Sequence, residues 1–179
     1  MRLLLVGAMA FLMVAGCGEE QTEVGTAVLP SQIVEGFVLH ESSSGARLYT
    51  LEAETAYVYD EEMRVDVFMP RVTFYDQEGA VHAFLDADRG AIFSETDDLV
   101  ARGNVLVETV DSTRLKTDSL TWNNREQLVR TDARVEIQTP KGKVEGIGLV
   151  SDAGLERIEI LSEVTGQSEY RFRPEGDSE

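Results

Sequence analysis

Hydrophobic and polar residues alternate along the middle of the chain with a period of two. The hydrophobic members of these runs are Val65, Val67 and Met69; Val72 and Phe74; Val105 and Val107; and Val135 and Ile137. Such a period places one face of a β-strand on a core and the other face in water. Residues typical of turns separate the runs, in the stretches 76–79, 123–124, 139–142 and 152–154. No long stretch has the spacing of an amphipathic helix, so the sequence predicts an all-β domain.

A repeat runs through the same region, with copies about 30 residues apart. The copies begin at Leu51, Leu85 and Leu115, each followed three positions later by an acid (Glu54, Asp88 and Asp118), and a fainter fourth copy begins at Val144. This period is long enough for two strands and two turns, which predicts stacked antiparallel hairpins that cover one another. For the fourth copy, chance similarity between hairpins is an equally good explanation. The recurring acid predicts a common role at a strand end or turn.

The start of the chain differs from the rest. Fourteen uncharged residues run from Leu3 to Gly16 and end at Cys17, the only cysteine. This run is shorter than the roughly 20 residues that span a bilayer, but it fits the hydrophobic region of a signal peptide. The sequence Val14-Ala15-Gly16-Cys17 resembles the lipobox of bacterial lipoproteins. That resemblance implies removal of residues 1–16 and lipidation of Cys17, and several acyl chains would give stable anchoring. An uncleaved signal-anchor helix is the alternative.

The acidic composition disfavours two classes of partner. The chain has 33 Asp and Glu against 16 Lys and Arg, a formal net charge of −17. Nucleic-acid binding and simple adsorption on anionic headgroups both need Lys and Arg, so this balance argues against each. A single cysteine also excludes an intramolecular disulfide and thiol-based zinc sites. We therefore predict one domain, residues 33–166, that depends on its core and lies between a flexible tether (17–32) and a polar tail (167–179).

Little in the sequence indicates catalysis. His40 and His82 fall in different hairpins, so we expect exposed polar positions rather than a nucleophilic triad or a histidine metal site. Asp86 and Asp88, and then Asp97 and Asp98, could pair for calcium binding or acid–base work. No loop has the length and glycine placement of a calcium loop. We expect no enzyme activity, no cofactor and no metal; an enzyme on a β-sandwich would need polar residues that converge in a pocket.

Several longer phrases resemble one family. The phrases are FYDQEG, LDADRGAIF, ARGNVLVET, LKTDSLTWNNREQLVRTDARVEI and VEGIGLVSD. Together they resemble the LptC family, the periplasmic component of the lipopolysaccharide-export system, over residues 33–166. The resemblance implies an open β-jellyroll of antiparallel strands with an apolar groove that takes the acyl chains of lipopolysaccharide. Many members of that family anchor by a transmembrane helix, whereas the start of this chain resembles a lipoprotein.

The hydrophobic positions of the predicted strands are the candidates for lining such a groove. They are Val72, Phe74, Leu85, Ile92, Val105, Val107, Leu115, Trp122, Val135 and Ile137. Burial of each methylene contributes about 0.8 kcal/mol, so a groove could hold acyl chains without specific polar contacts. Ordinary core packing is the alternative for each residue, because core and groove both demand apolar side chains.

An open sheet also has two edge strands, which can pair with a strand of another protein. The candidate edges are the segments 33–39 and 155–164, with Ile33, Val34, Phe37 and Leu39 in the first and Ile158, Ile160 and Val164 in the second. By resemblance, the first edge would meet the periplasmic domains of an inner-membrane ABC transporter, and the second would meet a soluble bridge protein of the same fold. Acids in both segments could discourage self-pairing, or could simply be solvated.

These expectations combine into an adaptor on the periplasmic side of the inner membrane that passes lipopolysaccharide from the transporter to the bridge protein. The alternative is a purely structural adaptor, a closed sandwich that binds partners through its edges and carries no lipid. Gly18 and Glu19 follow the cysteine, and because sorting rules at such positions differ among bacteria, the sequence leaves open whether the anchor lies in the inner or the outer membrane.

Overall fold

The computed structural model describes residues 28–43, 45–76, 78–152 and 154–168. These residues form an all-β fold with no helix among them, as the alternation predicts. The eleven strands are β1 (Gln32–Ser43), β2 (Ala46–Tyr59), β3 (Arg64–Phe68), β4 (Arg71–Tyr75), β5 (Val81–Asp86), β6 (Arg89–Phe93), β7 (Asp98–Thr109), β8 (Arg114–Asn123), β9 (Leu128–Thr139), β10 (Gly142–Asp152) and β11 (Ile158–Ser168).

The predicted signal peptide, Cys17, residues 17–27 of the predicted tether and residues 169–179 of the predicted tail lie outside the described residues. Within the described ranges, no helix has the length and hydropathy needed to cross a bilayer. The observed sheet begins at Gln32 and ends at Ser168. The division of the chain into signal peptide, tether, domain and tail therefore stays a prediction.

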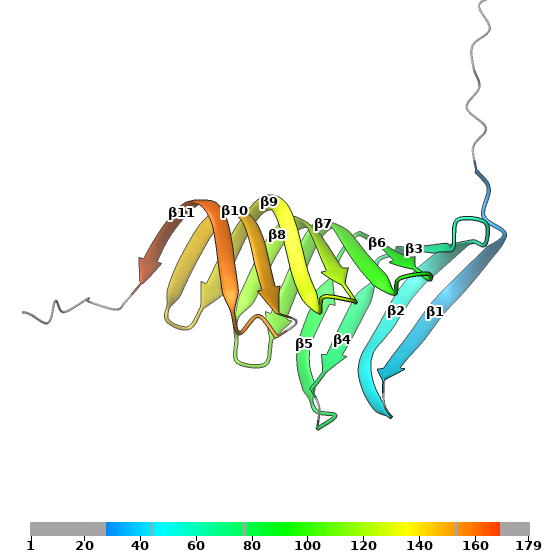
Figure 1. Ribbon diagram of the computed structural model, residues 1–179, viewed down its shortest axis with the longest axis horizontal. Coiled ribbons are helices and arrows are strands. Elements are labelled where there is room, and N and C mark those ends of the chain that lie inside the picture. Colours follow the sequence, from blue (N-terminus) through cyan, green and yellow to red (C-terminus); the bar gives the residue numbers. More distant parts are fainter. Residues whose placement is uncertain (1–27, 44, 77, 153, 169–179) are drawn as a thin grey trace, which may run out of the picture.

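All strands belong to one twisted antiparallel sheet that does not close into a barrel (Figure 1). The order is β11-β10-β9-β8-β7-β5-β4-β2-β3-β6, β7 also pairs with β6, and β1 pairs with β2. The two edge strands, β1 and β11, lie at opposite ends of the longest axis of the molecule (Figure 1). The predicted open arrangement of antiparallel hairpins is confirmed.

The sheet folds over on itself because two long strands change partners halfway along. In β2, residues 49–52 pair with β4 and residues 55–59 pair with β3. In β7, residues 98–102 pair with β6 and residues 106–109 pair with β5. One half of each strand therefore lies in a layer with β3 and β6, and the other half lies in a layer with β4 and β5. We call these the β3–β6 layer and the β4–β5 layer, and the line where strands cross between them the crease.

Backbone irregularities at the crease allow the long strands to bend. The ladders shift register between Arg102 and Val105, between Thr117 and Thr121, and between Ile147 and Leu149. Such bulges bend a strand and increase its twist. Gly103 has a positive φ of 76°, and a Cβ there would lie 2.5 Å from the Oδ2 atom of Asp88. Only glycine fits this position without strain.

The sequence repeat corresponds to successive crossings of the crease. Glu54 lies between the two paired halves of β2, and Asp118 lies within the register shift of β8. Asp88 joins β5 to β6, where its N–H donates to the carbonyl of Gly103 at 3.0 Å and its Oδ2 accepts from Asn104 at 2.8 Å. The predicted strand-end role is confirmed for Asp88.

The turns close the hairpins where the sequence predicts them. Asp76 Oδ1 accepts hydrogen bonds from the N–H groups of Glu78 and Ala80, both at 2.9 Å. Thr139 Oγ1 accepts from the N–H of Lys141 at 3.2 Å, in the turn between β9 and β10. Side chains that hydrogen-bond the backbone two residues on stabilise such turns locally. The strands they connect then bury one face of each layer against the other.

Candidate functional site

An apolar cavity of about 60 Å³ lies between the two layers. Val72, Phe74 and Leu85 line it from the β4–β5 layer, and Val67 and Gly90 line it from the β3–β6 layer. The rest of the lining is Leu51, Pro70, Ala91, Leu99, Val100, Ala101, Val107, Leu120, Trp122, Val129 and Leu155. No charged side chain borders the cavity among the described residues, so it is suited to an apolar ligand.

The structure divides the predicted groove residues into two sets. Val72, Phe74, Leu85, Val107 and Trp122 line the cavity. The others lie in the packed core away from it, between 0% and 7% exposed: Ile92, Val105, Leu115, Val135 and Ile137. Both sets are apolar, and apart from the half-buried Phe74 and Trp122 all are buried, so the alternation does not distinguish them. That any of these side chains contacts lipid stays a prediction.

Several residues that line the cavity were not predicted from the sequence. Leu51 occupies the first position of the repeat, so the repeat could have found it. Leu99, Leu120 and Val129 belong to strand halves of the β3–β6 layer, whose alternation the sequence shows less clearly. Leu155 lies in a turn, and no periodic signal marks it.

The size of the cavity limits what the closed structure can hold. Ligand pockets for small molecules usually measure about 300–1,000 Å³, and one buried water needs roughly 10–15 Å³ on a comparable scale. A cavity of about 60 Å³ therefore has space for only a few water-sized groups. An acyl chain could enter only if the two layers separate or if the turn that closes the cavity moves.

The turn between β10 and β11 closes one side of the cavity. Leu155 of this turn is 7% exposed and lies among the lining residues. The preceding residue, Gly154, holds its carbonyl 3.3 Å from Nε2 of His82 on β5. His82 is half-buried rather than exposed, so that prediction was wrong for this histidine. The segment 155–157 is likewise part of the turn and not of the predicted edge strand.

A carboxylate fixes the shape of this turn. Asp152 Oδ1 accepts from the N–H of Glu156 at 2.8 Å, and Oδ2 lies 3.2 Å from Nε of Arg157. Burial acts to raise the pKa of Asp152, but these hydrogen bonds outweigh burial and hold the pKa below its usual value. The ionised carboxylate therefore stabilises the conformation that places Leu155 in the cavity.

Two uncharged polar side chains, Tyr49 and Ser151, lie close to residues that line the cavity. The ring centroids of Tyr49 and Phe74 lie 6.2 Å apart, and burial raises the pKa of Tyr49 to about 12, with smaller contributions from nearby acids. Ser151, opposite Val129 in the β9–β10 ladder, is 2% exposed. Its Oγ has no hydrogen-bond partner among the described residues. Ser151 itself is not one of the residues that line the cavity.

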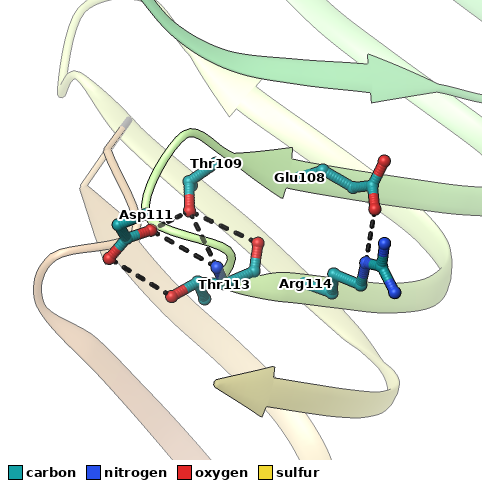
Figure 2. Close-up of polar contacts among 5 residues, drawn as sticks. All are labelled: Glu108, Thr109, Asp111, Thr113 and Arg114. Carbon is teal, nitrogen blue, oxygen red and sulfur yellow. Dashed lines mark hydrogen bonds and ion pairs between the residues drawn. The ribbon is translucent and has the colours of Figure 1, made fainter. Parts of the chain in front are cut away.

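Polar contacts gather at the turn between β7 and β8, as Figure 2 shows. Glu108 and Arg114 are opposed in the ladder and form an ion pair. The Thr109 hydroxyl donates to Asp111, and the N–H of Thr113 donates to Thr109 Oγ1 at 3.2 Å. The hydrogen bond from Thr109, followed by that from the Thr113 N–H, lowers the pKa of Asp111. The ion pair lies on the outer face, whereas Thr109 and Thr113 are each 8% exposed and fix the turn.

Both edge strands present apolar side chains to the inner face. Half-buried residues packed against the core are Val34, Phe37 and Leu39 in β1, and Ile158 and Ile160 in β11. Ile33 and Val164 are 62% and 58% exposed. The acids considered above as a means to discourage self-pairing of these segments are all exposed: Glu35, Glu156, Glu159 and Glu163. The apolar inner face thus continues to both ends of the sheet.

Several acids and histidines that were considered above for catalysis form ion pairs or hydrogen bonds within the fold. Asp86 Oδ1 lies 2.7 Å from Nε of Arg71, and Asp98 Oδ1 accepts from the N–H of Asn124 at 2.8 Å. His40 is exposed, as predicted, with Nδ1 3.1 Å from the Thr50 hydroxyl. Over the described ranges, no three His, Cys, Asp or Glu residues lie close enough together to hold a metal ion.

An apolar cavity inside a folded open sheet is the arrangement that the resemblance implied. A family model described as lipopolysaccharide-assembly, LptC-related, matches residues 3–169. The chain belongs to the LptC-related family. An LptC-related chain takes part in lipopolysaccharide assembly and transport in the cell envelope, in a family that is not known as enzymatic. No curated protein matches the chain.

Proposed function

We propose that this LptC-related chain is a membrane-anchored periplasmic adaptor that carries lipopolysaccharide. It receives the lipid from an inner-membrane ABC transporter and passes it to a bridge protein of the same fold. The observation that carries the proposal is the apolar cavity between the two layers, with an edge strand at each end of the sheet. Lipidation of Cys17 is the proposed anchor, and the proposed membrane is the inner one because the transporter lies there.

The energetics favour an acyl chain as the ligand. Each methylene that leaves water contributes about 0.8 kcal/mol, so ten methylenes would contribute about 8 kcal/mol. Separation of the layers costs part of this energy, because it breaks contacts across the cavity. The remainder holds the lipid without trapping it, since a neighbouring groove of the same chemistry offers equal burial.

The two edges give the transfer a direction. A strand of the transporter added to β1 and a strand of the bridge protein added to β11 would place their inner faces in line with the inner face of this sheet. The half-buried Phe37 in β1 and Ile160 in β11 would then become lining residues of a continuous groove.

A purely structural adaptor is the second candidate, and the small volume of the cavity favours it. In that case the layers stay closed, lipid never enters, and the edges alone explain the role of the chain in assembly.

Blocking one edge at a time would test the proposed direction of transfer. Proline substitutions are scanned through residues 33–35 and 159–161, and variants that keep the parent unfolding midpoint are retained, because proline is tolerated where an edge N–H faces solvent. A photocrosslinking amino acid at Val107 then reports lipopolysaccharide in living cells. We expect a blocked β1 edge to abolish the lipid adduct and a blocked β11 edge to increase it. If neither block changes the adduct, the proposed handoff is wrong; if no variant and no parent gives an adduct, the structural adaptor is correct.

A further inference from the structure

Two arginines face each other on the outer surface of the β3–β6 layer. Arg89 of β6 and Arg102 of β7 are directly opposed in the antiparallel ladder, and both are exposed. The Cα atoms of such a pair lie about 4.5–5.5 Å apart, and like charges in this position destabilise a sheet. Neither guanidinium forms an ion pair with a described residue. In a chain with a net charge of −17, an uncompensated pair of cations is unexpected.

The neighbouring arginine shows the contrast. Arg64 of β3 has Glu62 at 2.8 Å and Asp66 at 2.9 Å, so carboxylates compensate its charge. Among the described residues, the contact of the Arg89 guanidinium is aromatic: its carbon lies 5.4 Å from the centre of the Phe68 ring. That contact orients the guanidinium and leaves its N–H donors available.

The arginine pair borders a hollow of about 840 Å³ with an apolar floor. Ala91 and Val100 lie on the floor, and the rings of Phe68 and Phe93, 40% and 37% exposed, stand beside it. Arg64, Asp66 and Asp88 also line the hollow, but Asp66 pairs with Arg64 and Asp88 accepts from Asn104. The hollow therefore combines two cationic donors that have no ion-pair partner among the described residues with apolar surface. Its arginines lie on the outer face, and the hollow shares four lining residues with the interlayer cavity: Val67, Gly90, Ala91 and Val100.

We propose that Arg89 and Arg102 bind the phosphate group of an amphiphilic molecule whose apolar part rests on the hollow floor and the two phenylalanines. Guanidinium groups match phosphate oxygens in a fork geometry, and a phosphate between them removes their mutual repulsion. The acidic surface as a whole disfavours adsorption on an anionic membrane, so the proposal concerns a single bound molecule. A phosphorylated lipid headgroup is the chemistry we commit to, with free inorganic phosphate as the other possible source of the same group.

Calorimetric titration of the purified full chain tests the site with three probes. The first is dihexanoyl phosphatidic acid, which has both phosphate and apolar groups. The second is dihexanoyl phosphatidylcholine, in which the positive choline group balances the charge of the phosphate. The third is inorganic phosphate. We expect the phosphatidic acid to bind at least about tenfold more tightly than either of the others, because a charge-assisted hydrogen bond contributes about one factor of ten or more. If inorganic phosphate binds as tightly as the phosphatidic acid, the lipid source is wrong.

Matched variants distinguish the loss of this site from a general loss of positive charge. Arg89→Gln and Arg102→Gln should each weaken phosphatidic acid binding about tenfold, and together at least about 30-fold. The double variant Arg71→Gln/Arg114→Gln loses the same charge from ion pairs elsewhere and should bind like the parent. Equal losses in both double variants would overturn the proposal.

The unfolding midpoint of the ligand-free protein gives an independent readout. Arg102→Gln should raise it slightly, because the like-charge repulsion disappears. A large fall of the midpoint would mean that the arginines are structural, and it would overturn the inference even if binding were also lost. Failure of this site would leave the proposed lipid transfer untouched, because the interlayer cavity shares neither arginine.

Discussion

Filling the interlayer cavity should make the protein more stable and less able to carry lipid. Ala101 is 7% exposed and lines the cavity, with Gly90 and Leu120 opposite it in the ladders. The substitution Ala101→Leu adds three carbon atoms to a space of about 60 Å³. At about 0.8 kcal/mol for each buried carbon, the gain is at most about 2.4 kcal/mol. Imperfect fit costs part of it, so we expect a net stabilisation of about 1 kcal/mol.

A matched variant shows whether the space is at Ala101 in particular. Ala83 of β5 is also a buried alanine, at 0% exposure, but it does not line the cavity. Ala83→Leu should therefore overpack the core and destabilise the protein by about 1–3 kcal/mol. Urea unfolding followed by the fluorescence of Trp122, the single tryptophan, measures both changes.

The functional readout must move in the opposite direction from stability. With a photocrosslinking residue at Val107, the Ala101→Leu chain should give fewer lipopolysaccharide adducts than the parent despite its higher stability. If Ala101→Leu destabilises the protein as much as Ala83→Leu does, the cavity is not available space. If it stabilises the protein and leaves the adducts unchanged, lipid does not pass through the cavity, and the reasoning is refuted.

Three further predictions concern the scaffold around the cavity. Leu115→Ala should cost about 4–5 kcal/mol in urea unfolding, at the upper end of the usual range, because this side chain is 0% exposed and packed on all sides; a loss below about 2 kcal/mol would contradict the assigned packing. Gly103→Ala should cost about 1–3 kcal/mol, because φ is +76° and the new Cβ would meet Asp88; an unchanged midpoint would mean that the crease is pliable. Asp152→Asn should remove the stabilisation that the ionised carboxylate gives the parent above about pH 4, and the parent itself loses this stabilisation as pH falls through the lowered pKa of Asp152. The difference in unfolding midpoint between parent and variant should therefore shrink in acid. A constant difference from neutral to acidic pH would disprove the stabilising role of the ionised carboxylate.

The sequence predicts the strands of this fold well, because alternation depends only on which face of a strand is buried. Val105 and Val107, for example, are buried on one face, and Glu108 is less buried on the other. The crease is harder to predict, since a bend out of the sheet plane leaves the period of two unchanged. The repeating acids of Glu54, Asp88 and Asp118 mark the crease, but only the structure shows that they do.

The boundary between cavity and core cannot be read from the sequence. Leu85 and Leu115 have the same side chain and the same repeat position, yet only Leu85 lines the cavity. What distinguishes them is the strand on the opposite layer, which depends on how the sheet folds over. Leu155 completes the cavity from a turn, where its burial depends on the contact between Gly154 and His82 and not on any local pattern.

The central claim is that an acyl chain of lipopolysaccharide occupies the cavity between the layers. Its most direct test compares photocrosslinking residues at two neighbouring positions of β8 in living cells: Trp122, which lines the cavity, and Thr121, which is exposed on the outer face. We expect lipopolysaccharide adducts at position 122 that disappear when the transporter cannot hydrolyse ATP, and none at position 121. Equal adducts at both positions, or no adduct at position 122 while the protein remains in complex with its partners, would contradict the claim.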